Sequence, residues 1–123
     1  MAHQTADITN LHRGSKLEIP VAVTDSAGDA FDLTGTSVFF YILRRQHDDV
    51  HTGSDTPNLQ KDNTGTGGLQ VTDAQAGKLL VTIAPGDWPG IPRSRNPYEL
   101  WVEDSATNPA KAVSGVLRVD KPA

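Results

Sequence analysis

The sequence predicts an all-β domain, and three observations support this prediction. Apolar and polar residues alternate in several short runs, which is the pattern of half-buried strands. Segments with helical periodicity are nearly missing. The 123 residues include 11 glycines and 8 prolines, which mark many tight connections between short elements. Because this length is typical of one domain, we expect a single domain over residues 1–123.

The first clear strand pattern covers residues 16–24, where apolar side chains occupy alternate positions. An acidic turn at 25–29 follows and indicates a hairpin loop. The run 37–43 is apolar at both odd and even positions, so neither face of this strand is plainly the exposed one. Residues 1–7 are expected to form a short flexible N-terminus. The polar, glycine-containing segment 45–66 is expected to be a long mobile loop.

The second half contains four further strand patterns, at 68–72, 78–83, 98–103 and 112–119. A proline-rich connection around Trp88 separates the second of these from the third. About seven strands at these spacings predict an immunoglobulin-like antiparallel β-sandwich. The shared period of two predicts the core, which we expect to contain Val21, Val23, Val38, Phe40, Ile42, Val81, Ile83, Leu100, Val102 and Leu117.

The charge balance argues against several classes of partner. The chain carries 11 Lys and Arg residues against 15 Asp and Glu residues, a formal net charge of −4. Nucleic-acid binding needs clustered positive charge, so we expect no nucleic-acid partner. No apolar run is long enough to span a membrane, and the first residues lack the pattern of a signal peptide. Cysteine is absent, which fits folding in a cytoplasm without disulfides.

The residues that could carry chemistry do not form a catalytic or metal-binding motif. His47 and His51 have the spacing of two metal ligands on a helix, but loop-forming residues flank them, so we expect no metal and no cofactor. No cysteine nucleophile or Gly-x-Ser-x-Gly motif is present, so we expect no enzyme. A weak anionic site and scattered solvated charges are the two interpretations of the basic residues Arg44, Arg45, Lys61, Arg93 and Arg95.

Three aromatic residues are candidates for an interface. If Phe40 and Leu100 fill the core, the alternation of their strands turns Phe39, Tyr41 and Trp101 outward. Adjacent strands would make these three aromatics a contiguous patch that docks on another protein or on another copy of the chain. The alternative is that loop 45–66 or the proline-rich connection folds over them. The sequence leaves both interpretations open.

Several motifs resemble those of the Ig-like structural proteins of tailed-phage virions, in particular the N-terminal domain of baseplate upper proteins. The similarity extends over roughly residues 8–120 and rests on the segments Ile8–Gly14, Leu17–Gly28, Asp32–Val38, Asp73–Leu79, Pro97–Asp104 and Gly115–Val119. The resemblance implies a non-enzymatic module that is assembled in the host cytoplasm and resides in the virion. It also implies several copies in each particle and allows a homo-oligomer.

The resemblance leads us to expect a docking or adaptor protein of the tail, baseplate or fibre attachment region that binds other virion proteins. One alternative is a head decoration protein on the capsid surface. Another is a module that binds carbohydrate or the host surface, with Trp88 and Trp101 exposed as stacking residues. The two binding classes differ in their surfaces: glycan binding predicts an aromatic platform in a cleft, whereas docking predicts a flat apolar patch.

Overall fold

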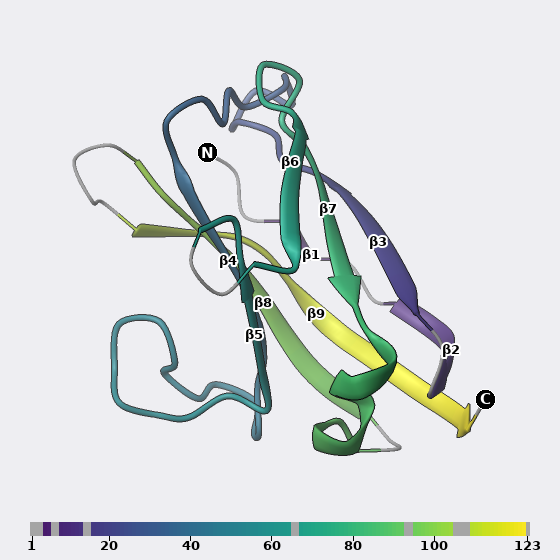
Figure 1. Cartoon of the computed structure of the whole chain (residues 1–123). Helices are drawn as coiled ribbons and strands as arrows, with labels where there is room; N and C mark the ends of the chain where they lie inside the picture. Colours follow the sequence, from purple (N-terminus) through teal and green to yellow (C-terminus); the bar gives the residue numbers. More distant parts are fainter. Residues whose placement is uncertain are drawn as a thin grey trace.

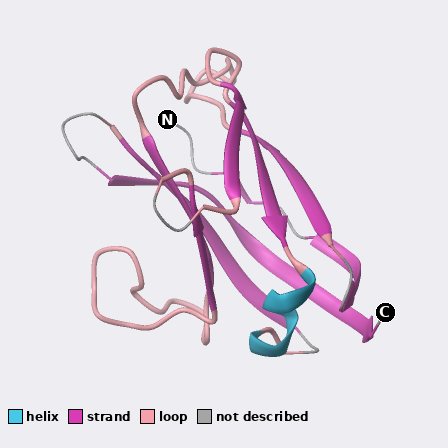
Figure 2. Cartoon of the chain, in the orientation of Figure 1, coloured by secondary structure: helices cyan, strands magenta, loops and turns pink. Residues whose placement is uncertain are grey.

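The computed structural model describes the backbone of residues 4–5, 8–13, 16–64, 67–92, 95–104 and 109–122. Within these ranges almost all regular structure is strand, and the one helical element is a short 3-10 helix, η1 (Figure 2). The elements in chain order are β1 (Gln4–Thr5), β2 (Ile8–Arg13), β3 (Leu17–Ala22), β4 (Ser37–Ile42), β5 (Leu59–Asp62), β6 (Leu69–Asp73), β7 (Lys78–Ile83), η1 (Pro85–Gly90), β8 (Arg95–Glu103) and β9 (Pro109–Pro122).

The strands form two sheets that pack as two layers (Figure 1). The larger sheet has the order β1-β9-β8-β4-β5, and β2 also pairs with β9. The smaller sheet has the order β3-β7-β6. Pairing is antiparallel throughout, except that β1 and β2 run parallel to β9. The prediction of an all-β fold is therefore confirmed, with the layers arranged as in a β-sandwich.

The core lies between the two sheets, where the period-two patterns placed it. Nine of the ten predicted core residues are buried; Val21 is half-buried and packs against their cluster. Phe40 occupies the centre of β4, is 1% exposed and packs its ring 5.7 Å from that of Tyr98. Trp88 closes one end of the layers from η1 and is 2% exposed. The alternation therefore identifies which face of each strand meets the other sheet.

The structure corrects the extent of the predicted loop 45–66. Residues Leu59–Asp62 within it form β5, which pairs in an antiparallel register with β4. This strand has one apolar residue, Leu59, so it lacks an alternating pattern that sequence could reveal. Its conformation comes from the hydrogen bonds that the edge of β4 offers, a tertiary effect that overrides local propensity. Similarly, β1 lies within residues 1–7, which the sequence presents as flexible.

Short polar side chains hold the turns at one end of the sheets. The Asp25 carboxylate accepts hydrogen bonds from the amides of Ala27 and Asp29, which explains the acidic composition of this turn. Gly77 has φ of +68°, and a Cβ there would lie 2.5 Å from the carbonyl oxygen of Val23. Only glycine fits that approach. These acidic turns thus have a structural role in the hairpins.

Candidate functional site

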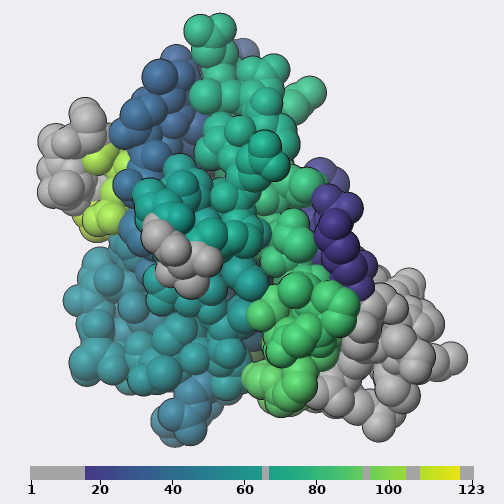
Figure 3. Space-filling model, viewed as in Figure 1, coloured from purple at the N-terminus to yellow at the C-terminus, as the bar shows by residue number. Residues whose placement is uncertain are grey.

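The outer face of the larger sheet, opposite the core, carries the three aromatic residues that the sequence singles out. Phe39 and Trp101 are direct neighbours across β4 and β8, and Tyr41 lies two positions further along β4. Tyr41 is nevertheless only 4% exposed, and Phe39 and Trp101 are half-buried. Residues 43–58, here called the covering loop, fold over them and stand out at the lower left of Figures 1 and 3. Of the two interpretations of this aromatic patch, the structure agrees with the one in which a loop folds over the rings.

His51 is the residue of the covering loop that closes over these rings. Its imidazole stacks on Trp101 with ring centres 4.8 Å apart and an angle of 17° between the planes. The same ring lies 4.8 Å from Phe39, and its Nδ1 is 2.7 Å from the hydroxyl oxygen of Tyr41. Nε2 lies 3.7 Å from a carboxylate oxygen of Glu103, and the His51 side chain is only 6% exposed. The loop is thus fastened to the sheet by both packing and polar contacts.

The ionisation of this cluster favours a neutral imidazole. Burial, reinforced by the charges of Glu103 and Asp62, raises the pKa of Tyr41 to about 12, so its hydroxyl keeps its proton and can donate it to Nδ1 of His51. The proton of the neutral imidazole then sits on Nε2, on the side of Glu103. Burial also lowers the pKa of His51, although the charge of Glu103 opposes this shift. At neutral pH the ring therefore fits its surroundings without charge.

A buried ion pair adjoins the aromatic cluster. Glu99 is 6% exposed, and one of its carboxylate oxygens lies 2.8 Å from Nζ of Lys111. The other accepts a hydrogen bond of 3.0 Å from the indole N–H of Trp101. Nζ of Lys111 also lies 5.6 Å from the centre of the Trp101 ring, within the range of a cation–π interaction. Glu99 is thereby paired on both oxygens, which is what a buried carboxylate requires.

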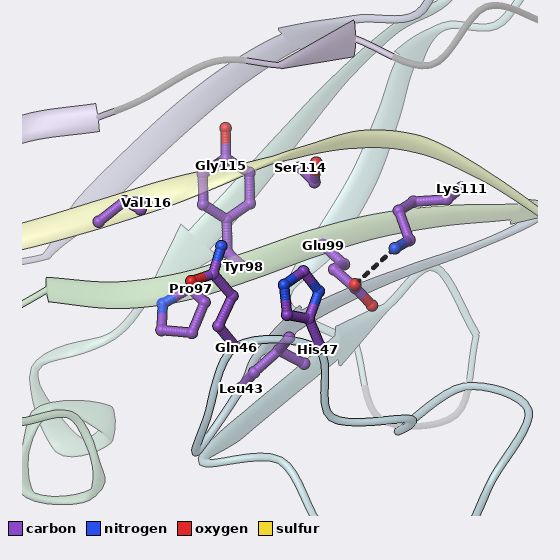
Figure 4. A pocket seen from close by; sticks show the side chains of 10 residues that line it. All are labelled: Leu43, Gln46, His47, Pro97, Tyr98, Glu99, Lys111, Ser114, Gly115 and Val116. Carbon is purple, nitrogen blue, oxygen red and sulfur yellow. Dashed lines mark ion pairs between the residues drawn. The ribbon is translucent and has the colours of Figure 1, made fainter.

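A cleft of about 320 Å³ opens between the covering loop and the outer face of β8 and β9 (Figure 4). Its floor is partly apolar, since Pro97 and Val116 are direct neighbours across the two strands. Polar groups border it: the Glu99–Lys111 pair and, from the loop, Gln46 and His47. The ring of Tyr98 points away from the loop, and its side chain belongs to the core. The cleft is a mixed apolar and polar surface with no aromatic platform.

His47 has an unusual backbone conformation at the edge of this cleft. It is the third residue of a turn closed by a 3.2 Å hydrogen bond from the Asp48 amide to the Arg45 carbonyl, and its φ is +70°. Glycine or asparagine is the usual residue at such a position. A side chain held there costs about 1 kcal/mol or more, and such strain is concentrated at functional sites. In this backbone conformation the imidazole of His47 lines the cleft.

Two arginines lie beside the cleft in an arrangement that sequence analysis missed. Arg95 and Arg118 are exposed and directly opposite each other, one on β8 and one on β9. Arg44 and Arg45, both exposed, follow Leu43, whose amide donates to the carbonyl oxygen of Pro97. None of these four arginines forms an ion pair with a carboxylate whose side chain the structure describes. The outward position of Arg118 in its alternating strand was the signal for this pair, but the cross-strand register was needed to see it.

The other predicted site residues are not brought to this face. Lys61 pairs with Asp87 at 2.8 Å, and Arg93 lies outside the described residues. His47 and His51 have separate surroundings, and no group of three or more potential metal ligands occurs in the part of the chain that the structure describes. Trp88 is buried, so the expectation of an exposed Trp88 for glycan stacking was wrong. No helix within the described ranges is both long and apolar enough to cross a membrane.

No family model matches the chain, and no curated protein matches it in sequence.

Proposed function

We propose that this protein is a non-enzymatic structural protein of a tailed-phage virion, which docks other virion proteins in the tail, baseplate or fibre attachment region. The sequence motifs that resemble Ig-like virion proteins motivate the proposal. The observation that carries it is the outer face of the larger sheet, where the covering loop and strands β8 and β9 form a cleft with a partly apolar floor and no aromatic platform for a glycan. This surface is a cleft and not the flat apolar patch that the sequence led us to expect for docking. Such a face, backed by a packed core, is a rigid platform for a protein partner.

The order of the strands supports an immunoglobulin-like architecture for this module. In that architecture the second, fifth and fourth strands of the sandwich share one sheet, and the third, sixth and seventh share the other. With β1 and β2 together taken as the first strand and β5 as the extra strand beside the third, the smaller sheet β3-β7-β6 and the run β9-β8-β4-β5 match this order. Loops on such a sandwich commonly form binding surfaces.

The first experiment asks whether the protein is part of the particle and where. Purified phage particles should contain the protein by mass spectrometry, and a cryo-electron microscopy reconstruction should show its two-sheet density at the tail or baseplate. Density on the capsid surface would instead support the head decoration alternative. Absence of the protein from purified particles would contradict a structural role.

A pair of variants tests whether the cleft face is the docking surface. Val116→Glu places a charge on the apolar floor of the cleft, so we expect the protein to fold but to incorporate poorly into particles. Leu80→Glu is the matched control, because Leu80 is equally half-buried on the outer face of the smaller sheet. Equal incorporation of both variants would show that docking uses another surface.

A further inference from the structure

We propose that the cleft and the arginines beside it bind an acidic peptide segment of the partner, in which carboxylate side chains flank an aliphatic one. This inference rests on the proposed docking function and specifies the chemistry of the partner. It is carried by the cross-strand order of side chains on the outer face of β8 and β9. Along the two strands, the pair Arg95 and Arg118 is followed by the pair Pro97 and Val116.

Charge complementarity favours carboxylates at one end of the cleft. Like charges that face each other across two strands destabilise a sheet, yet Arg95 and Arg118 are such a pair and have no described counter-ion. Arg44 and Arg45 of the covering loop lie near the same end of β8, because Leu43, which precedes them, donates a hydrogen bond to Pro97. This concentration of positive charge, which has no counter-ion among the described side chains, occurs on a chain with a net charge of −4. Arginine binds carboxylates through paired hydrogen bonds, so an acidic segment would neutralise this cluster.

The spacing of the side chains favours an extended peptide. The arginine pair and the Pro97–Val116 pair are two residues apart along each strand, which corresponds to about 7 Å. Side chains two residues apart on one face of an extended peptide have the same separation. A carboxylate over the arginines therefore places the next side chain of that face over the apolar floor. Beyond it, His47 and Lys111 border the cleft with further hydrogen-bond donors.

A nucleic acid is a less suitable ligand for this positively charged surface than an acidic peptide. Single strands are bound by stacking their bases on exposed aromatic rings. The Tyr98 ring is in the core, and the Trp101 ring is covered by His51. The cleft volume of about 320 Å³ is at the small end of ligand sites and fits a few side chains. The surface therefore offers aliphatic contact and arginine donors, which suit a peptide.

Fluorescence anisotropy of a labelled Glu-Ser-Leu-Ser-Glu peptide, here called the Glu–Leu peptide, tests this inference on the full chain. Its Glu, Leu and Glu side chains share one face when the peptide is extended. We expect saturable binding that weakens with added salt, and binding at least about tenfold weaker for the same peptide with Gln in place of Glu. Arg95→Glu should weaken binding of the Glu–Leu peptide by about tenfold or more. Lys78→Glu is the matched control, because it makes the same charge change on an exposed residue of the smaller sheet. It should change binding less than twofold, roughly.

The thermal stability of the Arg95→Glu variant distinguishes a loss of binding from a loss of folding. Arg95→Glu replaces a like-charge pair with an opposite-charge pair, so its thermal midpoint should not decrease. Equal weakening by Lys78→Glu, or equal binding of the Gln peptide, would overturn the inference. Binding of an oligothymidine strand without binding of the Glu–Leu peptide would replace it with a nucleic-acid site. If the protein is located in the particle but the peptide does not bind, the docking function stands and the acidic partner is refuted.

Discussion

The imidazole of His51 packs against the rings of Phe39, Tyr41 and Trp101 and shields them from solvent. A lone histidine in a polar segment most often remains solvated, and nothing in the sequence around His51 distinguishes it from His47. The two differ in their surroundings: one ring is buried against aromatic rings, whereas the other lines a cleft. Their roles at the level of the residue are therefore separable by substitution.

The buried imidazole predicts a loss of stability in acid. Burial holds the pKa of His51 below its usual value of about 6.5, so the unfolded chain binds the proton more readily than the folded one. The free energy of unfolding should therefore be fully maintained above pH 6.5, roughly, and decrease as the pH falls below it. Urea midpoints measured across this range will show the decrease.

The control for this titration is His51→Gln, which cannot be protonated. The difference between its pH profile and that of the wild type isolates the contribution of His51. Glu103→Gln should deepen the effect, because the charge of Glu103 raises the pKa of His51 against the effect of burial. Identical profiles for wild type and His51→Gln would refute the role of this ring.

His47→Gly should stabilise the protein. Glycine accepts a φ of +70° without the clash of a Cβ, so relief of strain is worth about 1 kcal/mol, minus the entropy that glycine adds to the unfolded state. Gln46→Gly, at the preceding position, whose φ is not positive, should be neutral or destabilising. Chemical denaturation measures both. A lower midpoint for His47→Gly than for Gln46→Gly would contradict the interpretation of strain.

Phe40→Ala should cost about 3–5 kcal/mol, because the ring is almost completely buried at the centre of β4. That is a large share of the stability of a small domain. The denaturation midpoint should decrease accordingly. An unchanged midpoint would mean that the two faces of β4 are assigned the wrong way round.

At the level of the element, the sequence does not reveal two features of residues 43–62: the closure of the covering loop over the aromatic residues, and the strand β5 that follows it. His51 of the covering loop contacts both β4 and β8, and the loop ends where β5 begins at Leu59. Neither could be predicted from local pattern, because β5 depends on pairing with β4 and the closure by His51 depends on the register of β4 with β8. The strands with alternating patterns, such as β3 and β7, were predictable because burial on one face imposes that alternation.

Limited proteolysis with trypsin tests how firmly His51 holds this loop. Arg44 and Arg45 provide cleavage sites at its start, and we expect the first cut there, because the loop has few buried apolar contacts. His51→Ala removes contacts with three rings, each worth about 0.5–1.5 kcal/mol, so cleavage should become faster. Cleavage after Lys78, within β7, serves as the internal reference. A rate unchanged by His51→Ala would show that other contacts hold the loop.

For the whole molecule, the two-layer arrangement could be predicted from the sequence, and the candidate functional face could be predicted only in part. The sequence placed Phe39 and Trp101 on the face away from the core, and their half-buried positions opposite the core agree with this. It could not show that Tyr41 is covered, that Lys111 pairs with Glu99, or that Arg118 faces Arg95, because each depends on residues brought together by cross-strand register.

The parallel pairing of the first strands with β9 has a mechanical consequence. β1 and β2 begin beside the middle of β9 and run in its direction toward Pro122 (Figure 1). In a parallel pair, tension between the start of one strand and the end of the other acts along the strands, so it shears their hydrogen bonds together. An antiparallel hairpin pulled apart at its open end instead releases its bonds one after another. If the protein is loaded through both of its ends, the contact between β2 and β9 would resist such tension.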